Sequence, residues 1–411
     1  MKKYLEKIKP TYIVFALFCF AIIIKYLVGA FYYNEMDTFW YLDWAKGLQN
    51  GFFNAYSQLK SLDYPPMYLY PLFLIGAIYK IEFIANNKQL LMLLLKFFPI
   101  LFDILCGLLI FKIVSKKSLK LALLFSTFWL FNPSIFFNSS FWGQTDSIMM
   151  FLLILSFYLI EQKKPYLATI FFTIAVFTKF QVLFFAPIFL LEIFRFDFKK
   201  IIKSVVTAIV TFIVIFAPFM LFSGPFLPIK IYTRGFDAYQ YINLNSFNFY
   251  GLFELNWEKD SLNILPFLSY HNLSLIITLI SVLFIVFLYI KLENPSIWLT
   301  SFILMQIIFM FSTRMHERYQ IIVVPLILMA YFRFLDKRLL MVFISTSVIT
   351  FFNQALLLIK ANYFSEQWEP IWNSVLFYFS ILNVIIFIFS MVVCLNILFK
   401  KKEMENSIEQ E

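Results

Sequence analysis

Apolar runs of about 18 or more residues recur from one end of the chain to the other, separated by short polar stretches. A run of this length can cross the hydrocarbon core of a bilayer as a helix, whereas the strands of a membrane barrel alternate apolar and polar residues in short segments. Hydrophobic residues make up 62% of the chain and charged residues only 14%, which leaves too few polar groups to cover a water-soluble protein. The sequence therefore predicts an all-α polytopic integral membrane protein.

The apolar runs divide into about twelve predicted membrane-spanning helices, which form a single transmembrane domain over residues 1–411. The first run, from Tyr12 to Phe31, is longer than the apolar region of a signal peptide and ends in a poor cleavage site. We therefore expect it to be retained as a helix. The predicted spans are 11–31, 91–113, 119–137, 146–160, 166–178, 181–194, 202–222, 272–290, 297–313, 319–335, 339–359 and 372–398.

Short basic clusters between these runs determine the predicted topology. Most of the 34 Lys and Arg residues lie at 2–9, 112–120, 163–164, 195–203, 291, 333–338 and 400–402. Because cytoplasmic loops carry an excess of Lys and Arg, this pattern predicts a cell-membrane protein with both termini, including a tail at 399–411, in the cytoplasm. If the apolar piece at 66–81 crossed the membrane, every later cluster would change sides. It is therefore predicted to lie in or dip into the outer leaflet.

This topology gathers the polar stretches on the non-cytoplasmic side. They include a helical first outer loop at 32–90, with interfacial helices, and a large outer loop at 223–271. The cytoplasmic loops are short and basic and contain no glycine-rich phosphate loop. The net charge of +10 comes from these basic loops rather than from a nucleic-acid surface. The chemistry is therefore expected at the outer face.

Three aspartates are candidate site residues. Asp37 follows the first predicted span and is a carboxylate base at the bilayer interface, the N-cap of an amphipathic helix over 38–48, or both. Asp63, in Asp63-Tyr64-Pro65-Pro66, either returns toward Asp37 to form an acidic site or belongs to a stiff turn. Asp103 lies inside an apolar span, where a charge costs about 2.5 kcal/mol or more, so it either supports the outer site or is a paired packing residue.

Amides and a tryptophan complete the candidate acceptor or sugar site. The stretch Trp142-Gly143-Gln144-Thr145-Asp146-Ser147 joins the outer ends of two predicted helices, where Trp142 alone could be an interfacial anchor. Gln144 and Asp146 exceed what anchoring needs. The other candidates are Gln181, which interrupts an apolar stretch, and Asn245. The loop around Asn245 is rich in Tyr and Asn, which can bind a sugar; the alternative is that it is an ordinary ordered loop.

Cationic residues are candidate ligands for a phosphate group. Lys179 near the outer face either snorkels or binds phosphate as a point charge. The stretch Arg314-Met315-His316-Glu317-Arg318 joins two predicted helices, and its arginines either clamp a phosphate with His316 or snorkel. The two histidines have no metal-ligand spacing. No cofactor is predicted, and a divalent metal is compatible with the chemistry but not required.

The order of these motifs resembles that of the GT-C membrane glycosyltransferases. The closest likeness is to bacterial relatives of the second mannosyltransferase of GPI-anchor synthesis, and the dolichyl-phosphate-glucose glucosyltransferases share the layout. The resemblance implies a GT-C-like bundle, a polyprenyl-phosphate sugar donor and inverting transfer on the outer face. It implies that Asp37 is the base and that Lys179 and Arg314–Arg318 face the donor phosphate. The matching pieces are Asp37, Asp63-Tyr64-Pro65-Pro66, Asp103, Trp142–Ser147, Lys179-Phe180-Gln181 and Arg314–Arg318.

Two departures from the family patterns concern the substrates. Mannosyltransferases that act on proteins have an Asp-Glu pair in the first loop, whereas Asp37 is followed by Thr38. The glucosyltransferases have His-Phe-Gln where this chain has Trp142-Gly143-Gln144. The sequence thus predicts a mannosyl- or other hexosyltransferase for cell-surface glycan biosynthesis, with a lipid-linked or surface glycan acceptor. The alternatives are a lipid-linked oligosaccharide flippase or other transporter, whose site would lie near the midplane, and a polysaccharide polymerase.

Overall fold

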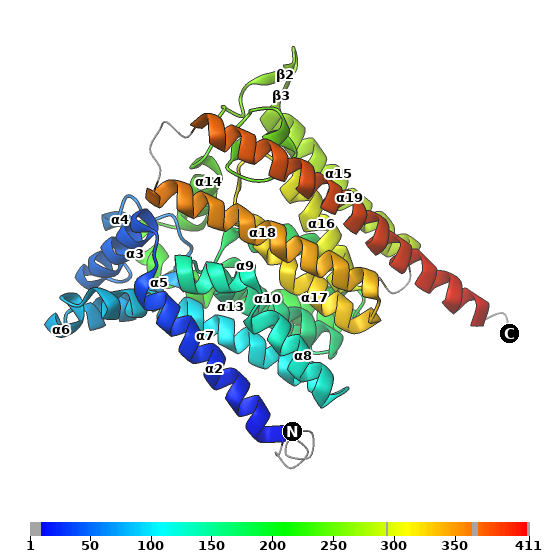
Figure 1. Ribbon diagram of the computed structural model, residues 1–411, viewed down its shortest axis with the longest axis horizontal. Coiled ribbons are helices and arrows are strands. Elements are labelled where there is room, and N and C mark those ends of the chain that lie inside the picture. Colours follow the sequence, from blue (N-terminus) through cyan, green and yellow to red (C-terminus); the bar gives the residue numbers. More distant parts are fainter. Residues whose placement is uncertain (1–9, 293–294, 364–368, 409–411) are drawn as a thin grey trace. The chain divides into compact units, whose positions relative to one another are not determined.

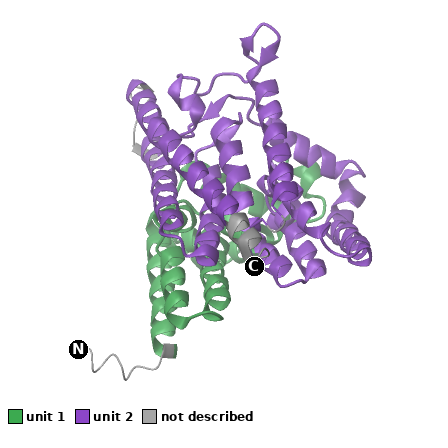
Figure 2. Ribbon diagram, turned by 90° about the vertical axis from the view of Figure 1, so that its right-hand side faces the viewer, with its two compact units in different colours: residues 1–60, 69–151 green, residues 61–68, 152–411 purple. Residues whose placement is uncertain are grey.

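The computed structural model describes residues 10–292, 295–363 and 369–408, and nearly all of its ordered elements are helices (Figure 1). The chain divides into two compact units (Figure 2). Unit 1 contains Met1–Lys60 and Leu69–Phe151, and unit 2 contains Ser61–Tyr68 and Leu152–Glu411. Each unit is built from helices whose apolar composition was evident in the sequence.

Unit 1 has two long helices, α2 (Pro10–Phe31) and α7 (Lys88–Ser115), which pack side by side, and α8 packs along α7 (Figure 1). The predicted first outer loop at 32–90 contains α3 and several shorter helices, and their position at a membrane interface stays a prediction. The remaining elements of this unit are α3 (Glu35–Gly47), η1 (Leu48–Asn50), α4 (Ala55–Gln58), most of α5 (Pro66–Tyr79), α6 (Glu82–Ala85), α8 (Leu119–Leu130), α9 (Pro133–Phe136), the π-helix η2 (Phe137–Trp142) and the start of α10 (Asp146–Glu161).

Local capping residues explain where several of these helices begin. The side-chain oxygen of Asn34 accepts a hydrogen bond from the backbone N–H of Asp37 at 2.9 Å, and Asn87 caps α7 in the same way. Such a contact satisfies a backbone donor that has no partner within the helix. The N-cap of the surface helix is therefore Asn34, and the alternative that Asp37 is that cap is wrong.

Unit 2 is a larger set of helices. In the sequence α15 to α19, successive helices pack against one another, with α16 beside both α15 and α17. Its elements are α11 (Pro165–Val176), η3 (Phe180–Phe185), α12 (Ala186–Ile193), α13 (Phe198–Ser223), α14 (Leu227–Asp237), β1 (Asn243–Leu244), η4 (Phe249–Leu252), β2 (Asn263–Leu265), β3 (Leu268–Ser269), α15 (Tyr270–Lys291), α16 (Ile297–Phe311), β4 (Met315–His316), η5 (Tyr319–Ile322), α17 (Val323–Phe334), α18 (Lys337–Tyr363) and α19 (Glu369–Ile408).

Helices occur at each of the twelve ranges predicted to cross a membrane, but their lengths differ. Among the described residues, six helices are long and apolar enough to cross alone, and a seventh crossing is formed if the bent pair Leu119–Leu130 and Pro133–Trp142 counts as one. The helix in the predicted outer-leaflet piece, α5, is one of the shorter apolar helices. The structure thus supports a helical membrane protein, whereas twelve crossings stay a prediction.

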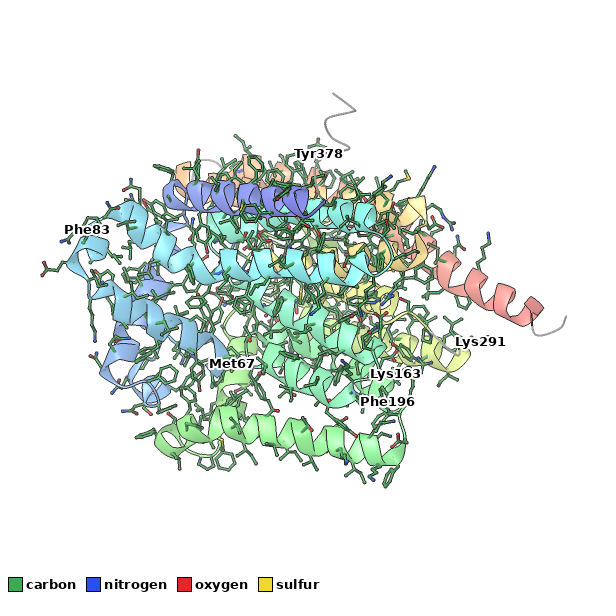
Figure 3. All side chains as sticks on the ribbon, turned by 90° about the horizontal axis from the view of Figure 1, so that it is seen from below. Met67, Phe83, Lys163, Phe196, Lys291 and Tyr378 are labelled. Carbon is green, nitrogen blue, oxygen red and sulfur yellow. The ribbon has the colours of Figure 1, made fainter. Side chains whose placement is uncertain are left out.

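The outer surface of α13 is consistent with contact with lipid. Val214 and Leu221 on this helix are 67% and 84% exposed, in a run of exposed aliphatic residues. A contiguous apolar face of this kind is rare on soluble monomers. The residues around the start of α13 are basic. Phe196 lies just before this helix, and the Lys163 ammonium, from the turn before α11, is 5.8 Å from the centre of its ring (Figure 3).

Short strands are the one departure from the all-helical prediction. β1 pairs in parallel with β4, with Asn243 opposite Met315 and Leu244 opposite His316. This pairing joins the 223–271 segment, which is predicted to be an outer loop, to the junction between α16 and α17. A second pair, β2 with β3, forms an antiparallel hairpin just before α15. Two-residue strands leave no periodic signal in a sequence.

Candidate functional site

Asp37 is held by two strong hydrogen bonds in unit 1. Its Oδ2 accepts a bond from Trp142 Nε1 and another from Gln144 Nε2, each at 2.6 Å. Among the described residues, nothing donates a hydrogen bond to the other oxygen, Oδ1, and the side chain is partly exposed. The arrangement orients a carboxylate and leaves one of its oxygens open to an incoming donor.

A residue on the same helix as Asp37 orients one of its hydrogen-bond donors. Tyr41 lies four residues further along α3 and therefore on the same face. Its hydroxyl donates to Gln144 Oε1 at 3.2 Å. Gln144 is fully buried, so both ends of its amide are used within the protein, one toward Asp37 and one toward Tyr41. This fixes the orientation of the amide and points its N–H toward the carboxylate.

The two donors to Asp37 are presented by an irregular turn. The π-helix Phe137–Trp142 ends at Gly143, whose φ of +86° lies in the left-handed region that glycine adopts without strain. The backbone N–H groups of Gly143 and Gln144 both bond to the Asn138 carbonyl at 3.0 Å. The turn thereby directs the neighbouring side chains, Trp142 and Gln144, to one carboxylate. π-helical turns are often found at functional sites.

Asp103 has a partner that the sequence interpretation did not name. Its Oδ2 lies 2.6 Å from Lys25 Nζ, and both side chains are fully buried. The carboxylate also accepts bonds from Ser139 Oγ at 2.6 Å and Trp129 Nε1 at 3.0 Å. The geometry therefore matches the packing alternative for Asp103: it links α2, α7, α8 and the π-helix. Its predicted place in the acceptor or sugar site stays a prediction.

Asp146 is likewise engaged within unit 1. It begins α10 and is 2% exposed, and its Oδ2 accepts a bond from Asn138 Nδ2 at 3.0 Å. Asn138 also provides the carbonyl that closes the turn before Gln144. Asp146 therefore stabilises the turn through Asn138. Its contact with a sugar stays a prediction.

Unit 2 gathers a second group of charged residues around Asp63. The charges of Arg234, Arg318 and Lys179 act on the Asp63 carboxyl. Burial raises the pKa of this carboxyl above its ordinary value, although a backbone hydrogen bond and the three cations oppose the rise. Asp63 Oδ1 is buried and has no hydrogen-bond partner among the described residues. An unsatisfied buried acceptor beside cations is typical of a binding site.

Backbone contacts explain how this group is assembled. The N–H of Met67 donates to the Phe177 carbonyl at 3.0 Å, which holds the Asp63–Pro66 turn beside the break between α11 and η3. Across the same break, Tyr232 on α14 donates its hydroxyl to the Val176 carbonyl at 2.9 Å. Residues from three distant parts of the sequence thus meet at the break.

The break itself carries two of the predicted residues. Lys179 is 4% exposed and has extended backbone just before η3. Gln181 is 3% exposed, and its Oε1 is another buried acceptor without a hydrogen-bond partner among the described residues. The break therefore presents a cation and an amide oxygen within three residues.

The arginines of the 314–318 junction are paired with carboxylates rather than open. Arg314 donates from Nε to Asp260 at 2.6 Å and also contacts Asp237 at 3.3 Å. Its backbone φ is +63°, and its N–H bonds to the Tyr241 carbonyl at 3.0 Å. Arg314 therefore ties the 223–271 segment to the junction, and no local sequence pattern predicts this pairing.

Glu317 organises the other two polar residues of the junction. It is 2% exposed, contacts Arg318 Nη1 at 2.6 Å and lies 3.6 Å from His316 Nδ1. Burial alone would raise the pKa of Glu317, but the Arg318 guanidinium and His316 outweigh it and hold the pKa at about 2. Glu317 thus stays ionised and orients both neighbours.

A cavity of about 390 Å³ opens beside this junction, entirely within unit 2. One wall is aromatic and comes from η3 and α14, and the Phe180 and Phe236 ring centres lie 5.2 Å apart. The rest is a mixture of hydroxyl, imidazole and guanidinium groups. The lining residues include Phe180, Phe184, Phe236, Tyr239, His271, Arg314, His316 and Tyr319. An apolar chamber with a polar rim suits an amphipathic ligand.

Asn245 lies next to this junction but its side chain is occupied. It forms an isolated bridge with His316. Its Oδ1 accepts bonds from Trp372 Nε1 at 2.8 Å and Asn256 Nδ2 at 3.0 Å, and its carbonyl accepts from Asn353 Nδ2 at 2.7 Å. These contacts connect the 223–271 segment to α18 and α19. Contact of Asn245 with a sugar stays a prediction.

Sequence reasoning missed three charged residues that the structure places in these groups. Lys25 and Lys96 lie inside apolar helices, where a charge is expensive and needs a partner. The rule that drew attention to Asp103 applies to both lysines and would have found them. Arg234, whose charge acts on Asp63, could not have been found in this way because it lies on the amphipathic helix α14, where a charged residue is unremarkable.

The comparison with protein families identifies the class of enzyme. The model of Glycosyltransferase family 87 matches residues 64–359, which is most of the chain. The chain belongs to glycosyltransferase family 87. A comparison with curated proteins found no match.

The matched residues of this family 87 glycosyltransferase contain nearly all of the predicted site. They include Trp142, Gln144 and the Arg314–Arg318 junction, but they begin after Asp37 and Asp63. Among the described residues, no group of three or more His, Cys, Asp or Glu side chains could hold a metal ion. The chain is thus a glycosyltransferase with apolar helices that can cross a membrane.

Proposed function

We propose that this chain transfers a hexose from a polyprenyl-phosphate donor to a hydroxyl of a lipid-linked or surface glycan, with inversion, at the outer face of the cell membrane. The observation that carries the proposal is the Asp37 carboxylate, oriented through Oδ2 by Trp142 and Gln144 with Oδ1 open. The family supports transfer of a sugar over the flippase alternative. The GT-C resemblance supports the choice of donor.

In this mechanism Asp37 is the general base. The acceptor hydroxyl gives its proton to Oδ1 as its oxygen forms a bond to the anomeric carbon, and the bond from that carbon to the phosphate oxygen breaks. The phosphate leaves with the electron pair. A single base on the face opposite the leaving group is what inversion requires, whereas retention by two carboxylates needs a second one as nucleophile. Trp142 and Gln144 hold the carboxylate in one orientation.

Following the GT-C resemblance, we assign the binding of the donor phosphate to cations of unit 2. The charges of Lys179, Arg234 and Arg318 all act on the Asp63 carboxyl and outnumber it, so the combined charge of this group is positive. Cations that face a phosphate stabilise the charge that develops as it departs. Because Arg314 is held by Asp260 and Asp237, we assign it mainly to shaping the loop, with His316 at the cavity rim.

The sugar and the lipid chain find complementary surfaces in the same unit. Asp63 Oδ1 and Gln181 Oε1 are buried acceptors that hydroxyl groups of a hexose could satisfy. The aromatic wall of the 390 Å³ cavity, with Phe180 and Phe236, would accept part of an isoprenoid chain. The resemblance favours mannose or glucose as the sugar.

The test is Asp37→Asn in the purified full-length protein. The assay follows transfer of radiolabelled mannose or glucose from polyprenyl-phosphate to a lipid extract of the native membrane. Loss of a general base should lower kcat by about 10²- to 10⁴-fold with little change in donor KM. Asp43→Asn, on the same helix, is the matched control and should transfer at the normal rate. Full activity of Asp37→Asn would refute the base assignment.

A further inference from the structure

Lys96 is a buried lysine whose ammonium group hydrogen-bonds to backbone carbonyls. Its side chain comes from the first third of α7, and the residue is 2% exposed. Its ammonium donates to the carbonyls of Ser140 at 2.9 Å, Phe141 at 2.8 Å and Tyr32. An ammonium has three donors, and these three acceptors use them all. Among the described residues, no carboxylate forms an ion pair with it.

The three carbonyls belong to the ends of two helices. Tyr32 directly follows the last residue of α2, and Ser140 and Phe141 lie in the last turn of the π-helix. Carbonyls at a helix C-terminus lack partners within the helix and carry partial negative charge. Two such ends repel each other unless a cation lies between them. Lys96 supplies that cation.

Gly143 makes room for the lysine stem. A Cβ at this position would lie 2.8 Å from Lys96 Cγ, closer than real Cβ contacts allow. Gly143 separates Trp142 from Gln144, the two residues that donate to Asp37. The lysine therefore passes directly against the turn that presents both donors.

We infer that Lys96 is a positioning residue for Asp37: by joining the C-termini of α2 and the π-helix, it fixes the carboxylate against Trp142 and Gln144. Tyr32 lies five residues before Asp37, and Phe141 immediately precedes Trp142. Without the ammonium the two segments lose their common anchor and separate. The inference rests on the proposed function, in which Asp37 is the base.

The first experiment compares Lys96→Met with Lys88→Met in the full-length protein, using the transfer assay with polyprenyl-phosphate mannose or glucose. Methionine keeps the length of the stem and removes the charge. Displacing a base by about 1 Å can cost about 10²-fold, so kcat should fall by roughly 10- to 100-fold with donor KM within about twofold. Lys88, exposed at the start of the same helix and stacked over Tyr33, is the matched control and should leave both constants unchanged.

A second variant covers the case in which Lys96→Met does not fold. Gly143→Ala leaves the lysine in place, but its methyl group presses against the stem and strains the turn at its positive φ, so kcat should fall by roughly tenfold or more with donor KM unchanged. Normal kcat in either folded variant overturns the inference, as does a parallel loss of kcat and donor binding. Asp37→Asn separates the two claims. If it is inactive while Lys96→Met is normal, only the role of Lys96 fails; if it is fully active, the proposed function fails.

Discussion

Breaking the Lys25–Asp103 pair should destabilise unit 1 more than removing both partners. The ammonium and carboxylate lie 2.6 Å apart in side chains with no exposed surface. Removal of one partner from a buried ion pair costs about 3–5 kcal/mol, because the other charge is left without compensation. Replacement of both by apolar residues of similar size is often neutral. The double variant Lys25→Met/Asp103→Leu should therefore be more stable than either single one.

The surroundings of each partner rank the single variants. In Lys25→Met, the carboxylate keeps the hydrogen bonds from Ser139 and Trp129, so the free energy of unfolding should fall by about 3 kcal/mol. In Asp103→Leu, the Lys25 ammonium keeps the Phe136 ring, whose centre is 4.5 Å away, as its one remaining partner among the described residues, and the cost should approach about 5 kcal/mol.

Thermal unfolding of the purified protein in detergent measures these differences. Lys112→Met, an exposed lysine at the end of α7, is the matched control and should unfold like the unaltered protein. Single variants within about 0.5 kcal/mol of the unaltered protein would show that the pair is not charged or not buried. A double variant less stable than both single ones would refute the argument from uncompensated charge.

Two further predictions concern unit 2. Because Glu317 has a pKa of about 2, below its ordinary 4.5, its ion pairs stabilise the fold above about pH 4.5 and are lost as the pH falls toward 2. Thermal unfolding between about pH 5 and pH 3 should therefore be less pH-dependent in Glu317→Gln than in the unaltered protein; equal slopes would contradict the pKa. Lys179→Met should raise the donor KM about tenfold, the loss of one charge-assisted contact of roughly 1.4 kcal/mol. Lys230→Met, an exposed lysine on α14, should leave KM unchanged, and a normal KM in Lys179→Met would exclude Lys179 from the phosphate site.

Part of the Asp37 site could be predicted because its members carry local signals. Asp37 and the Trp142–Asp146 stretch are polar residues at the ends of apolar runs, and the structure brings Asp37, Trp142 and Gln144 together. Which atoms meet could not be predicted. The bond from Trp142 to Asp37 spans 105 positions in the sequence, and its existence depends on how α3 meets the π-helix turn.

The arginine junction shows the opposite case. Arg314 and Arg318 were expected to face a phosphate, a role that nothing in the structure tests. Their immediate partners are Asp260 and Glu317, and the first of these lies 54 positions away in the outer loop. Residue types show that a guanidinium can bind an anion, but they do not show which anion is nearer. For Arg314 the partner is brought near where β1 pairs in parallel with β4, whereas Glu317 is already the sequence neighbour of Arg318.

The sequence by itself determined the membrane class and the positions of the helices, since run length and capping residues such as Asn34 and Asn87 act within a few residues of the chain. Only the tertiary structure decided how the buried charges are satisfied. Lys25 meets Asp103 across 78 positions, and Lys96 meets the ends of two helices. A charge inside an apolar helix indicates that a partner is needed, but packing between helices determines which partner it has.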